Sequence, residues 1–445
     1  MNWGTLEMPG INKTFAVATL GCKVNQYESS VMTGMFENRG YQAVEFGQQA
    51  DIYLINTCTV THLSDRKSRQ LIRRAVKTNP NALIIVTGCY AQTSPNDIMA
   101  IEGVNLVVGT VDRDKIVDFA EKVQGSAVVL NCVRKLDQGI KFEELPAQVV
   151  TSRERAFLKI EEGCSNYCSY CIIPFARGPQ RSRSLKDSLN QAKNLVEEGF
   201  KEIVLTGVHL GSYGRDLGGE ANLNSLISSI IKIPGLSRLR ISSLEPMDIT
   251  PDLIDTIASQ KGICHHLHIP LQSGDDQVLE NMRRNYSIND YRRVIKQIRE
   301  RIPGIALTTD VMVGFPGETD QQFCNTCDVI REISFSRLHV FKYSRRRGTP
   351  AAVFDHQIQP PVKEERSNVL LAISRELARD YASLHLGTVQ EVLVEGSYSK
   401  KTGFDEGLTD NYQRVLFPAV FNKRGEIVNI KIESLQGENL SGTII

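Results

Sequence analysis

The sequence predicts an α/β multidomain protein, and three patterns along its 445 residues support this fold class. The first is an N-terminal alternation of short apolar strands with helical segments, which is typical of an open parallel sheet. The second is a longer alternation with six strand segments, which is typical of a partial (β/α)6 barrel. The third is a C-terminal stretch of alternating residues, which is typical of a small β-barrel.

The overall charge, the hydrophobic pattern and the cysteine content of the chain limit the kinds of molecule that it can be expected to bind. Lysine and arginine number 52 against 51 aspartate and glutamate residues, so nucleic-acid binding must depend on local basic patches. The start, Met-Asn-Trp-Gly, lacks a basic segment followed by an apolar run, and no stretch approaches the ~18 apolar residues of a membrane helix. We therefore expect a cytoplasmic protein without a membrane partner. Its ten cysteines indicate metal or redox chemistry before disulfides.

Cysteines follow three successive strands of the N-terminal part. The expected strands are β-branched runs near residues 15–18, 51–55, 83–86 and 106–108. Cys22 follows the first strand, Cys58 the second and Cys89 the third. Because the carboxyl ends of parallel strands share one edge, these thiols can converge in space. Three unrelated buried thiols are the alternative, and the matched placement favours a site.

A polar stretch over residues 135–152 reads as a linker, and the second alternation begins after it. Its expected strands lie near residues 157–160, 202–205, 238–242, 266–269, 306–313 and 337–341. Polar and glycine-rich loops follow these strands, which predicts an active site at their carboxyl ends. A helix over 361–386 then leads to barrel strands near 389–395, 407–409, 414–417, 427–432 and 442–445. From Leu386 onward the sequence contains six basic and eight acidic residues, so the charge of this segment alone would not bind RNA.

The loop after the first strand of the second alternation carries Cys164, Cys168 and Cys171. Zinc sites built on cysteine normally use paired Cys-x2-Cys knuckles with a fourth Cys or His, and no such partner lies nearby in the sequence. Soft thiolates favour iron–sulfur clusters, and three ligands leave one iron of a [4Fe–4S] cluster open. The spacing therefore favours a cluster over zinc, and zinc over plain buried thiols.

Three blocks of the chain make it resemble the radical S-adenosylmethionine methylthiotransferases. They are Thr-Leu-Gly-Cys-Lys-Val-Asn-Gln-Tyr-Glu-Ser over 19–29, the run 164–183, and Val-Gly-Phe-Pro-Gly-Glu-Thr over 313–319. The resemblance covers nearly the whole chain. It implies two [4Fe–4S] clusters, an auxiliary one on Cys22, Cys58 and Cys89 and a catalytic one on the loop cysteines Cys164, Cys168 and Cys171. It also implies an RNA-binding C-terminal barrel of the TRAM type.

Within this family, Lys23 and Val24 after the first cysteine resemble the branch that acts on N6-threonylcarbamoyladenosine beside the tRNA anticodon. The resemblance implies transfer of a methylthio group to carbon 2 of that base. Related branches act on isopentenyladenosine in tRNA, usually with Gln-Met at this point, or on a ribosomal protein, with Pro-Lys. A non-catalytic iron–sulfur RNA-binding protein is the alternative from another class. Phe175, Ser169 and His209 depart from the commonest family pattern without removing a ligand.

The resemblance also implies a binding site for S-adenosylmethionine on the loops after the strands. Its expected contacts are Tyr170, Gly207, Ser243, Glu245 and Gln272. Tyr170 would lie against the adenine, Gly207 would allow close backbone approach, and Glu245 and Gln272 would contact the ribose or methionine end. Ordinary loop packing for Tyr170, a simple turn at Gly207 and an ion pair between Glu245 and a barrel arginine are the structural alternatives.

Two groups of arginines are candidates for phosphate contact. Arg66, Arg69 and Arg73 recur at helical spacing, and Arg177, Arg181 and Arg183 follow the cysteine loop. A solvated helix face is the plain interpretation of the first group. Cys324 and Cys327 fall in an expected helix and, with Cys132 and Cys264, are interpreted as non-ligands.

These patterns and the resemblance give the expected organisation. Residues 12–135 form a methylthiotransferase domain with the auxiliary cluster, 150–378 a radical S-adenosylmethionine domain, and 380–445 the TRAM-like barrel. The expected partners are a tRNA anticodon stem-loop and a low-potential electron donor such as flavodoxin or ferredoxin.

Overall fold

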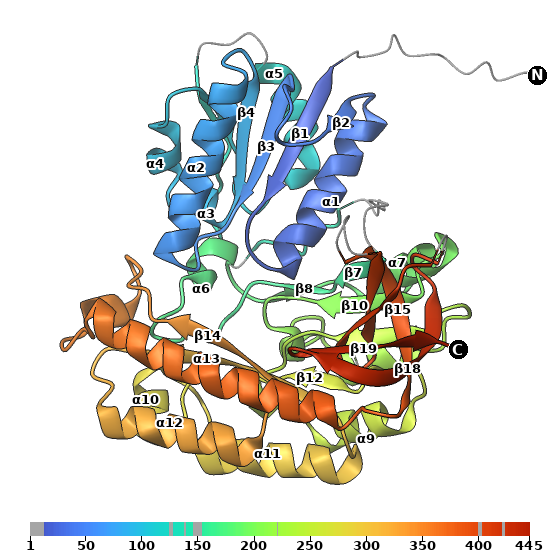
Figure 1. The fold of residues 1–445 in the computed structure, drawn as a ribbon. Helices are drawn as coiled ribbons and strands as arrows, with labels where there is room; N and C mark the ends of the chain where they lie inside the picture. Colours follow the sequence, from blue (N-terminus) through green and yellow to red (C-terminus); the bar gives the residue numbers. More distant parts are fainter. Residues whose placement is uncertain are drawn as a thin grey trace, which may run out of the picture. The chain divides into compact units, whose positions relative to one another are not determined.

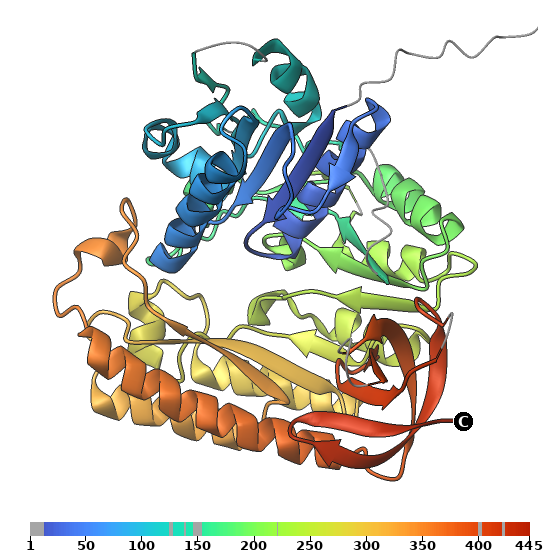
Figure 2. The same ribbon diagram turned by 45° about the horizontal axis from the view of Figure 1, so that its top comes forward.

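The computed structural model describes residues 13–123, 128–137, 139–145, 154–219, 221–398, 403–420 and 423–445. The chain divides into two compact units (Figures 1 and 2). The first comprises Met1–Val150, Gly163–Ser165 and Ile172–Pro179, and the second Thr151–Glu162, Asn166–Cys171 and Gln180–Ile445. Short pieces of the cysteine loop region therefore belong to the first unit, although the sequence predicts a single boundary near residue 150.

A parallel sheet of six strands forms the centre of the first unit and confirms the predicted fold class. Its order is β2 (Gln42–Val44), β1 (Thr14–Thr19), β3 (Ile52–Thr57), β4 (Leu83–Gly88), β5 (Val104–Val107) and β6 (Leu130–Asn131). The chain crosses from one side of β1 to the other, so the switch point of this doubly wound sheet lies between β1 and β3. Ligands in such sheets bind at the carboxyl edge beside the switch point.

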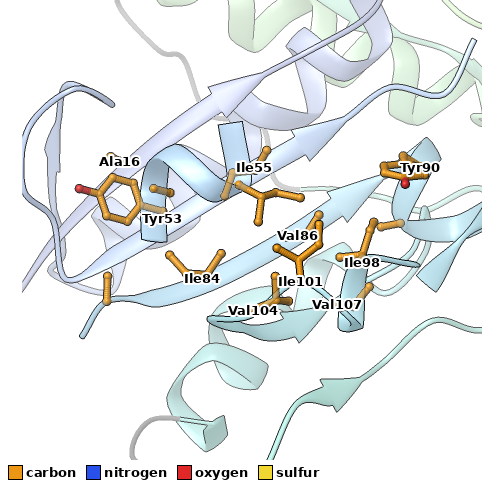
Figure 3. Close-up of a cluster of buried hydrophobic side chains, with 14 of the residues drawn as sticks. Ala16, Tyr53, Ile55, Ile84, Val86, Tyr90, Ile98, Ile101, Val104 and Val107 are labelled. Atoms are coloured by element: carbon orange, nitrogen blue, oxygen red, sulfur yellow. The ribbon is translucent and has the colours of Figure 1, made fainter. Parts of the chain in front are cut away.

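Helices cover both faces of this sheet, because its central strands are apolar on both sides. On one face α2 (His62–Thr78), α3 (Cys89–Thr93) and α4 (Pro95–Met99) pack over a cluster that includes Tyr53, Val86 and Ile98 (Figure 3). On the other face α1 (Lys23–Asn38) and α5 (Ile116–Val123) pack over a cluster that includes Phe15, Phe36 and Leu106. The two cores hold the carboxyl ends of β1, β3 and β4 in place.

The second unit contains the six predicted parallel strands. Two three-stranded sheets have the orders β11 (Arg238–Ile241), β10 (Glu202–Thr206), β7 (Arg155–Lys159) and β12 (His266–His268), β13 (Ala306–Val313), β14 (Arg337–Lys342). Parallel bridges Leu239 to Ile263 and Ser243 to His268 join them into one (β/α)6 sheet. Its main helices are α7 (Leu185–Glu197), α8 (Leu223–Ile230), α9 (Pro251–Ser259), α10 (Asp276–Asn281), α11 (Ile288–Arg301) and α12 (Asp320–Ile333).

The helix α13 (Pro360–Ser383) connects this sheet to a closed barrel of five strands. The barrel strands are β15 (Val389–Ser397), β16 (Phe404–Thr409), β17 (Arg414–Pro418), β18 (Ile427–Gln436) and β19 (Asn439–Ile444). Both elements confirm the sequence analysis. No helix within the described ranges is long and apolar enough to cross a membrane.

The turn between β16 and β17 packs against the amino ends of the (β/α)6 strands. Arg240 donates to the carbonyl oxygens of Asp410 (2.7 Å) and Thr409 (3.1 Å), and the ring of His266 stacks on Tyr412 at 4.8 Å. These contacts leave the carboxyl ends of the strands, where the candidate loops lie, clear of the barrel. Since sheet and barrel form one compact unit, the division into three domains stays a prediction.

Candidate metal centres

The structure places the three cysteines of the first unit at the carboxyl edge of its sheet. Cys22 precedes α1 just after β1, Cys58 follows β3, and Cys89 begins α3 directly after β4. Cys22 is exposed, whereas Cys58 and Cys89 are buried. Cys22 and Cys58 therefore flank the switch point, with Cys89 on the next strand, as the sequence predicts.

Local geometry fixes the backbone that carries these thiols. Gly88 has a φ of 94°, and a Cβ there would lie 2.4 Å from Asn56 Oδ1 and 2.5 Å from the carbonyl oxygen of Thr57. Only glycine accommodates that combination of conformation and crowding. The amide of Asn25 donates to the carbonyl oxygens of Leu20 (2.7 Å) and Thr57 (3.0 Å) and so holds two of the cysteine loops together.

Burial alone disfavours thiolates at two of these positions. It raises the pKa of Cys89 to about 12, with the charge of Arg177 acting in the opposite direction, and it also raises the pKa of Cys58. Arg177, which ends α6 (Ile173–Arg177), donates from Nε to Cys89 Sγ at 3.2 Å. A buried guanidinium beside a thiol supplies the charge that stabilises a metal-bound thiolate.

Arg177 belongs to a buried charge cluster behind the cysteines. Its Nη1 lies 2.8 Å from Glu28 Oε1, its Nη2 donates to Asn25 Oδ1 at 2.5 Å, and Arg113 also pairs with Glu28. Arg113 in turn pairs with Glu143, so two guanidiniums and two carboxylates balance one another in charge. Within this balanced cluster Arg177 also contacts Cys89, where its positive charge would stabilise a thiolate.

The three cysteines of the first unit are not arranged as a site for a single metal ion. Sulfurs that bind one tetrahedral zinc at ~2.3 Å lie roughly 3.8 Å apart. Within the residues that the structure describes, Cys22, Cys58 and Cys89 do not form a group whose ligand atoms all lie within 4.8 Å of one another. Their fit to an iron–sulfur cluster rests instead on the donor set, three soft thiolates at one sheet edge.

The loop cysteines divide between the two units. Cys164 belongs to the first unit, where its N–H donates to the carbonyl oxygen of Gly178 at 3.0 Å. Cys168 and Cys171 belong to the second unit, where the N–H of Cys171 donates to the carbonyl oxygen of Cys168 at 3.0 Å. Arg284 approaches Cys168 Sγ with Nη1 at 3.5 Å. Thiols on a short polar loop beside a guanidinium again fit a thiolate-bound cluster.

The structure gives several predicted S-adenosylmethionine contacts a partner within the protein. Glu245 forms an ion pair with Arg284, which is the structural alternative that the sequence leaves open. Gly207 sits where a Cβ would lie 2.7 Å from Glu161 Oε2, so close packing against Glu161 accounts for the glycine. Tyr170 packs against an apolar cluster that includes Phe315. Their binding roles stay predictions.

The two remaining contacts lie at the ends of adjacent strands. Ser243 is exposed and bridges to His268, immediately after β11. Gln272 has a left-handed backbone with a φ of 62°, and its N–H donates to the carbonyl oxygen of Asp310 at 2.9 Å. Both residues are therefore fixed by backbone pairing at the carboxyl side of the sheet, and their side chains have no assigned ligand.

The second arginine group requires a correction. Arg177, Arg181 and Arg183 are 1%, 3% and 2% exposed, so their guanidiniums cannot reach phosphate in this arrangement. Arg177 pairs with the buried Glu28, and Arg183 donates to the carbonyl oxygen of Lys159 at 3.5 Å. The sequence could not distinguish arginines that contact phosphate from arginines that are buried in the protein, because both can occur at the same spacing.

The first arginine group lies along α2. Arg66 and Arg73 are exposed, and the partly buried Arg69 donates to the hydroxyl of Tyr90 at 2.9 Å. Their availability for phosphate contact stays a prediction.

The cysteines interpreted as non-ligands lie apart from both cysteine groups in the sequence. Cys324 and Cys327 lie on α12, as expected. Burial raises the pKa of the Cys264 thiol to about 12.

Sequence reasoning missed two charged residues beside the thiols, Glu28 and Arg284. Glu28 is fully buried within α1, where a carboxylate needs a charged partner, and that partner is supplied by distant parts of the chain. The sequence signal for Glu28 is its place in the block over 19–29 that carries the family resemblance. Arg284 gave no signal, because its position beside Cys168 depends on the fold.

Family models and curated relatives agree with this arrangement. Residues 14–109 match the model described as uncharacterized protein family UPF0004, and residues 158–330 match the radical SAM superfamily. A threonylcarbamoyladenosine tRNA methylthiotransferase MtaB of Bacillus subtilis (strain 168) is 46% identical over 94% of this chain and 93% of its own. The enzyme of the same name from Thermotoga maritima is 37% identical over 96% of both chains.

More distant relatives share the fold. A tRNA-2-methylthio-N6-dimethylallyladenosine synthase of Acetivibrio thermocellus is 33% identical over all of this chain and 94% of its own. The structure of the radical S-adenosylmethionine methyltransferase TsrM from Kitasatospora setae is 16% identical and superposes with a TM-score of 0.57 over 77% of this chain and 75% of its own. Together with the two cysteine groups, these similarities show that the chain belongs to the radical S-adenosylmethionine methylthiotransferase family.

Proposed function

We propose that this protein adds a methylthio group to carbon 2 of N6-threonylcarbamoyladenosine in tRNA, giving 2-methylthio-N6-threonylcarbamoyladenosine. The convergence of Cys22, Cys58 and Cys89 at one sheet edge, in a chain that also carries the Cys164 loop, is the observation that supports this chemistry. The choice of base rests on the activity for which the 46% identical relative is named.

When bound, two [4Fe–4S] clusters and S-adenosylmethionine would supply one-electron cleavage of the cofactor and the methyl group of the product. Cys164, Cys168 and Cys171 would hold the cluster that takes the cofactor, and Cys22, Cys58 and Cys89 the auxiliary one. The side chains of this chain contribute charge and orientation around those ligands.

One arginine lies beside a candidate cluster ligand in each unit. Arg177 donates to Cys89, and Arg284 lies beside Cys168, so each places a fixed positive charge at a cluster thiolate. Such contacts favour ligand binding and raise the reduction potential of a cluster. Glu245 in turn orients Arg284 through their ion pair.

The cofactor contacts remain part of the proposal. Tyr170, Gly207, Ser243, Glu245 and Gln272 lie on loops at the carboxyl side of the second sheet, where barrels of this type bind ligands. Since Glu245 already pairs with Arg284, it would accept a cofactor group only with the carboxylate oxygen lone pairs that remain.

The proposed partners are a tRNA anticodon stem-loop and a low-potential donor of the flavodoxin or ferredoxin kind. A base in a single-stranded loop can be splayed out for chemistry at its edge. For RNA contact we retain Arg66, Arg69 and Arg73 on α2.

Nucleoside mass spectrometry tests the reaction and the base together. A bacterium stripped of its own methylthiotransferases receives this gene or the Cys58→Ala variant, and its tRNA is digested and compared. We expect a methylthio mass on threonylcarbamoyladenosine with the wild-type gene only. A methylthio mass on isopentenyladenosine, or unmodified tRNA despite active cofactor cleavage, would overturn the choice of substrate.

A further inference from the structure

A third group of candidate metal ligands, apart from the two cysteine groups, lies on three adjacent strands of the (β/α)6 sheet. His268 on β12, Asp310 on β13 and His339 on β14 bring one donor atom each to within 4.8 Å of one another. Among the residues that the structure describes, this is the group of three with that spacing. All three belong to the second unit and share no residue with the cysteine groups.

The strand registers explain why the three side chains meet. Thr308 pairs with His268, and Asp310 pairs with His339, so Thr308 and Asp310 point to the same face of the sheet at successive levels. The alternate residues of β13, Leu307, Thr309 and Val311, are buried on the other face of the strand. The group therefore lies on the more exposed face.

The distances within the group suit metal ligands as well as long hydrogen bonds. His268 Nε2 and His339 Nδ1 each lie 3.2 Å from the same oxygen, Asp310 Oδ1. Ligand atoms at ~2.0–2.1 Å from a tetrahedral zinc lie roughly 3.3 Å apart, whereas N–H···O hydrogen bonds are commonest at about 2.9–3.0 Å. An ion bound by these three side chains would replace the two contacts that the imidazole nitrogens make with Asp310.

A neighbouring threonine orients one of the histidines. Thr308 Oγ1 lies 2.9 Å from His268 Nδ1 and 3.0 Å from His266 Nε2. In the tautomer with the proton on Nδ1, His268 donates to Thr308 Oγ1 and its Nε2 lone pair is directed at Asp310, which is the tautomer that a metal ion bound to Nε2 would select. Metal-bound histidines characteristically hold their second nitrogen in such a hydrogen bond.

The group is open on one side. The side chains of His268, Asp310 and His339 are 12%, 27% and 51% exposed. Three protein ligands with solvent access are typical of zinc sites that keep a position for water or a ligand, and two histidines with one carboxylate also suit iron(II). We propose that His268, Asp310 and His339 bind one divalent transition-metal ion, which keeps an open position for water or an anionic oxygen.

Counting zinc and iron in the same sample distinguishes an ion at this site from the iron of the clusters. The full-length protein, with its clusters reconstituted under anaerobic conditions, is incubated with Zn²⁺ and desalted, and zinc and iron are counted by mass spectrometry. We expect the wild type to retain about one zinc per chain more than His339→Ala, with equal iron. His339 is half exposed, so its replacement should leave the fold intact.

Two further variants complete the experiment. His265→Ala removes an exposed histidine next to β12 that is outside the group and should keep the zinc. Asp310→Asn keeps the shape of the side chain and should lose the zinc as His339→Ala does. Equal zinc in the wild type, His339→Ala and Asp310→Asn would show that the three residues form only an ion-paired cluster.

Cobalt substitution identifies the ligands. Co²⁺ bound to nitrogen and oxygen donors gives visible bands without the intense charge-transfer absorption of cobalt thiolates. We expect such bands in the wild type and in His265→Ala, and their loss in His268→Ala and His339→Ala. Thiolate charge-transfer bands that survive in both histidine variants would place the ion on cysteines and overturn the proposal.

Discussion

The two cysteine groups each contain three thiols, but they differ in how far apart those thiols lie in the sequence. Cys164, Cys168 and Cys171 lie within one short loop, whereas Cys22, Cys58 and Cys89 come from three segments that a parallel sheet brings together. A loop can keep its ligands close even when its surroundings are perturbed. A group that depends on strand order requires the whole sheet. Substitutions should therefore affect the two groups differently.

The largest expected effect follows from removal of a loop cysteine. Cys164→Ala should abolish cleavage of S-adenosylmethionine to 5′-deoxyadenosine, because only two ligands for the catalytic cluster remain. The auxiliary iron and the fold should persist. Chromatography of the cleavage product after reduction measures the effect, and undiminished 5′-deoxyadenosine formation would contradict the proposed role.

Removal of a sheet cysteine should separate the two activities. Cys58→Ala should retain cofactor cleavage and lose methylthio transfer, because Cys58 belongs to the other ligand group. The ratio of methylthiolated nucleoside to 5′-deoxyadenosine, measured in one reaction, reports the difference. A variant that still produces the modified nucleoside would show that the auxiliary cluster is held elsewhere.

Adding one methyl group at Gly88 tests whether the backbone at the end of β4 positions the cysteines of the auxiliary cluster. In Gly88→Ala the new Cβ would meet Asn56 and Thr57 in a backbone conformation that alanine avoids, which should displace Cys89. We expect iron per chain to fall by roughly half, since one of two clusters is lost. Gly304→Ala is the control, because its φ is 77° but a Cβ there meets nothing within 4 Å. Equal iron in the two variants would refute this explanation.

The segment before the loop cysteines should show a pH-dependent stability. Burial raises the pKa of Glu161 from 4.5 to about 8, partly opposed by hydrogen bonds from the N–H groups of His209 and Val208. Between these pH values the folded chain keeps a proton that the unfolded chain has released, so stability falls as pH rises.

Glu161→Gln should remove this dependence, because glutamine does not titrate. Relative to the wild type, the free energy of unfolding of the variant should rise from about pH 4.5 to about pH 8, by a total on the order of several kcal/mol, and its melting temperature should rise with it. Differential scanning calorimetry at a series of pH values measures it. A constant difference between the two proteins across that range would mean that Glu161 stays ionised when folded.

The smallest expected effect concerns the surface. Arg66→Ala with Arg73→Ala should weaken tRNA binding and lower the salt dependence of binding by about one unit of slope for each arginine that binds a phosphate. Both arginines are exposed on α2, and Arg375→Ala on α13 provides a matched control. Binding isotherms at several salt concentrations decide the matter, and slopes equal to that of the control would exclude phosphate binding by α2.

Much of the fold follows from the sequence alone. The β-branched runs near 15–18 and 83–86 became β1 and β4, and the strand predicted over 306–313 is β13. Apolar runs of this kind specify buried parallel strands because both faces of such a strand are covered. The three cysteines after successive strands could therefore be grouped before their distances were known.

Sequence by itself determined the ligand types, their spacing in the loop and the alternation of elements, because these depend on neighbouring residues. Only the tertiary structure decided the burial of Arg177 against Glu28 and the approach of Arg284 to Cys168. It also decided the meeting of His268, Asp310 and His339 on adjacent strands. Contacts between distant residues depend on strand order and register, which a local pattern does not encode.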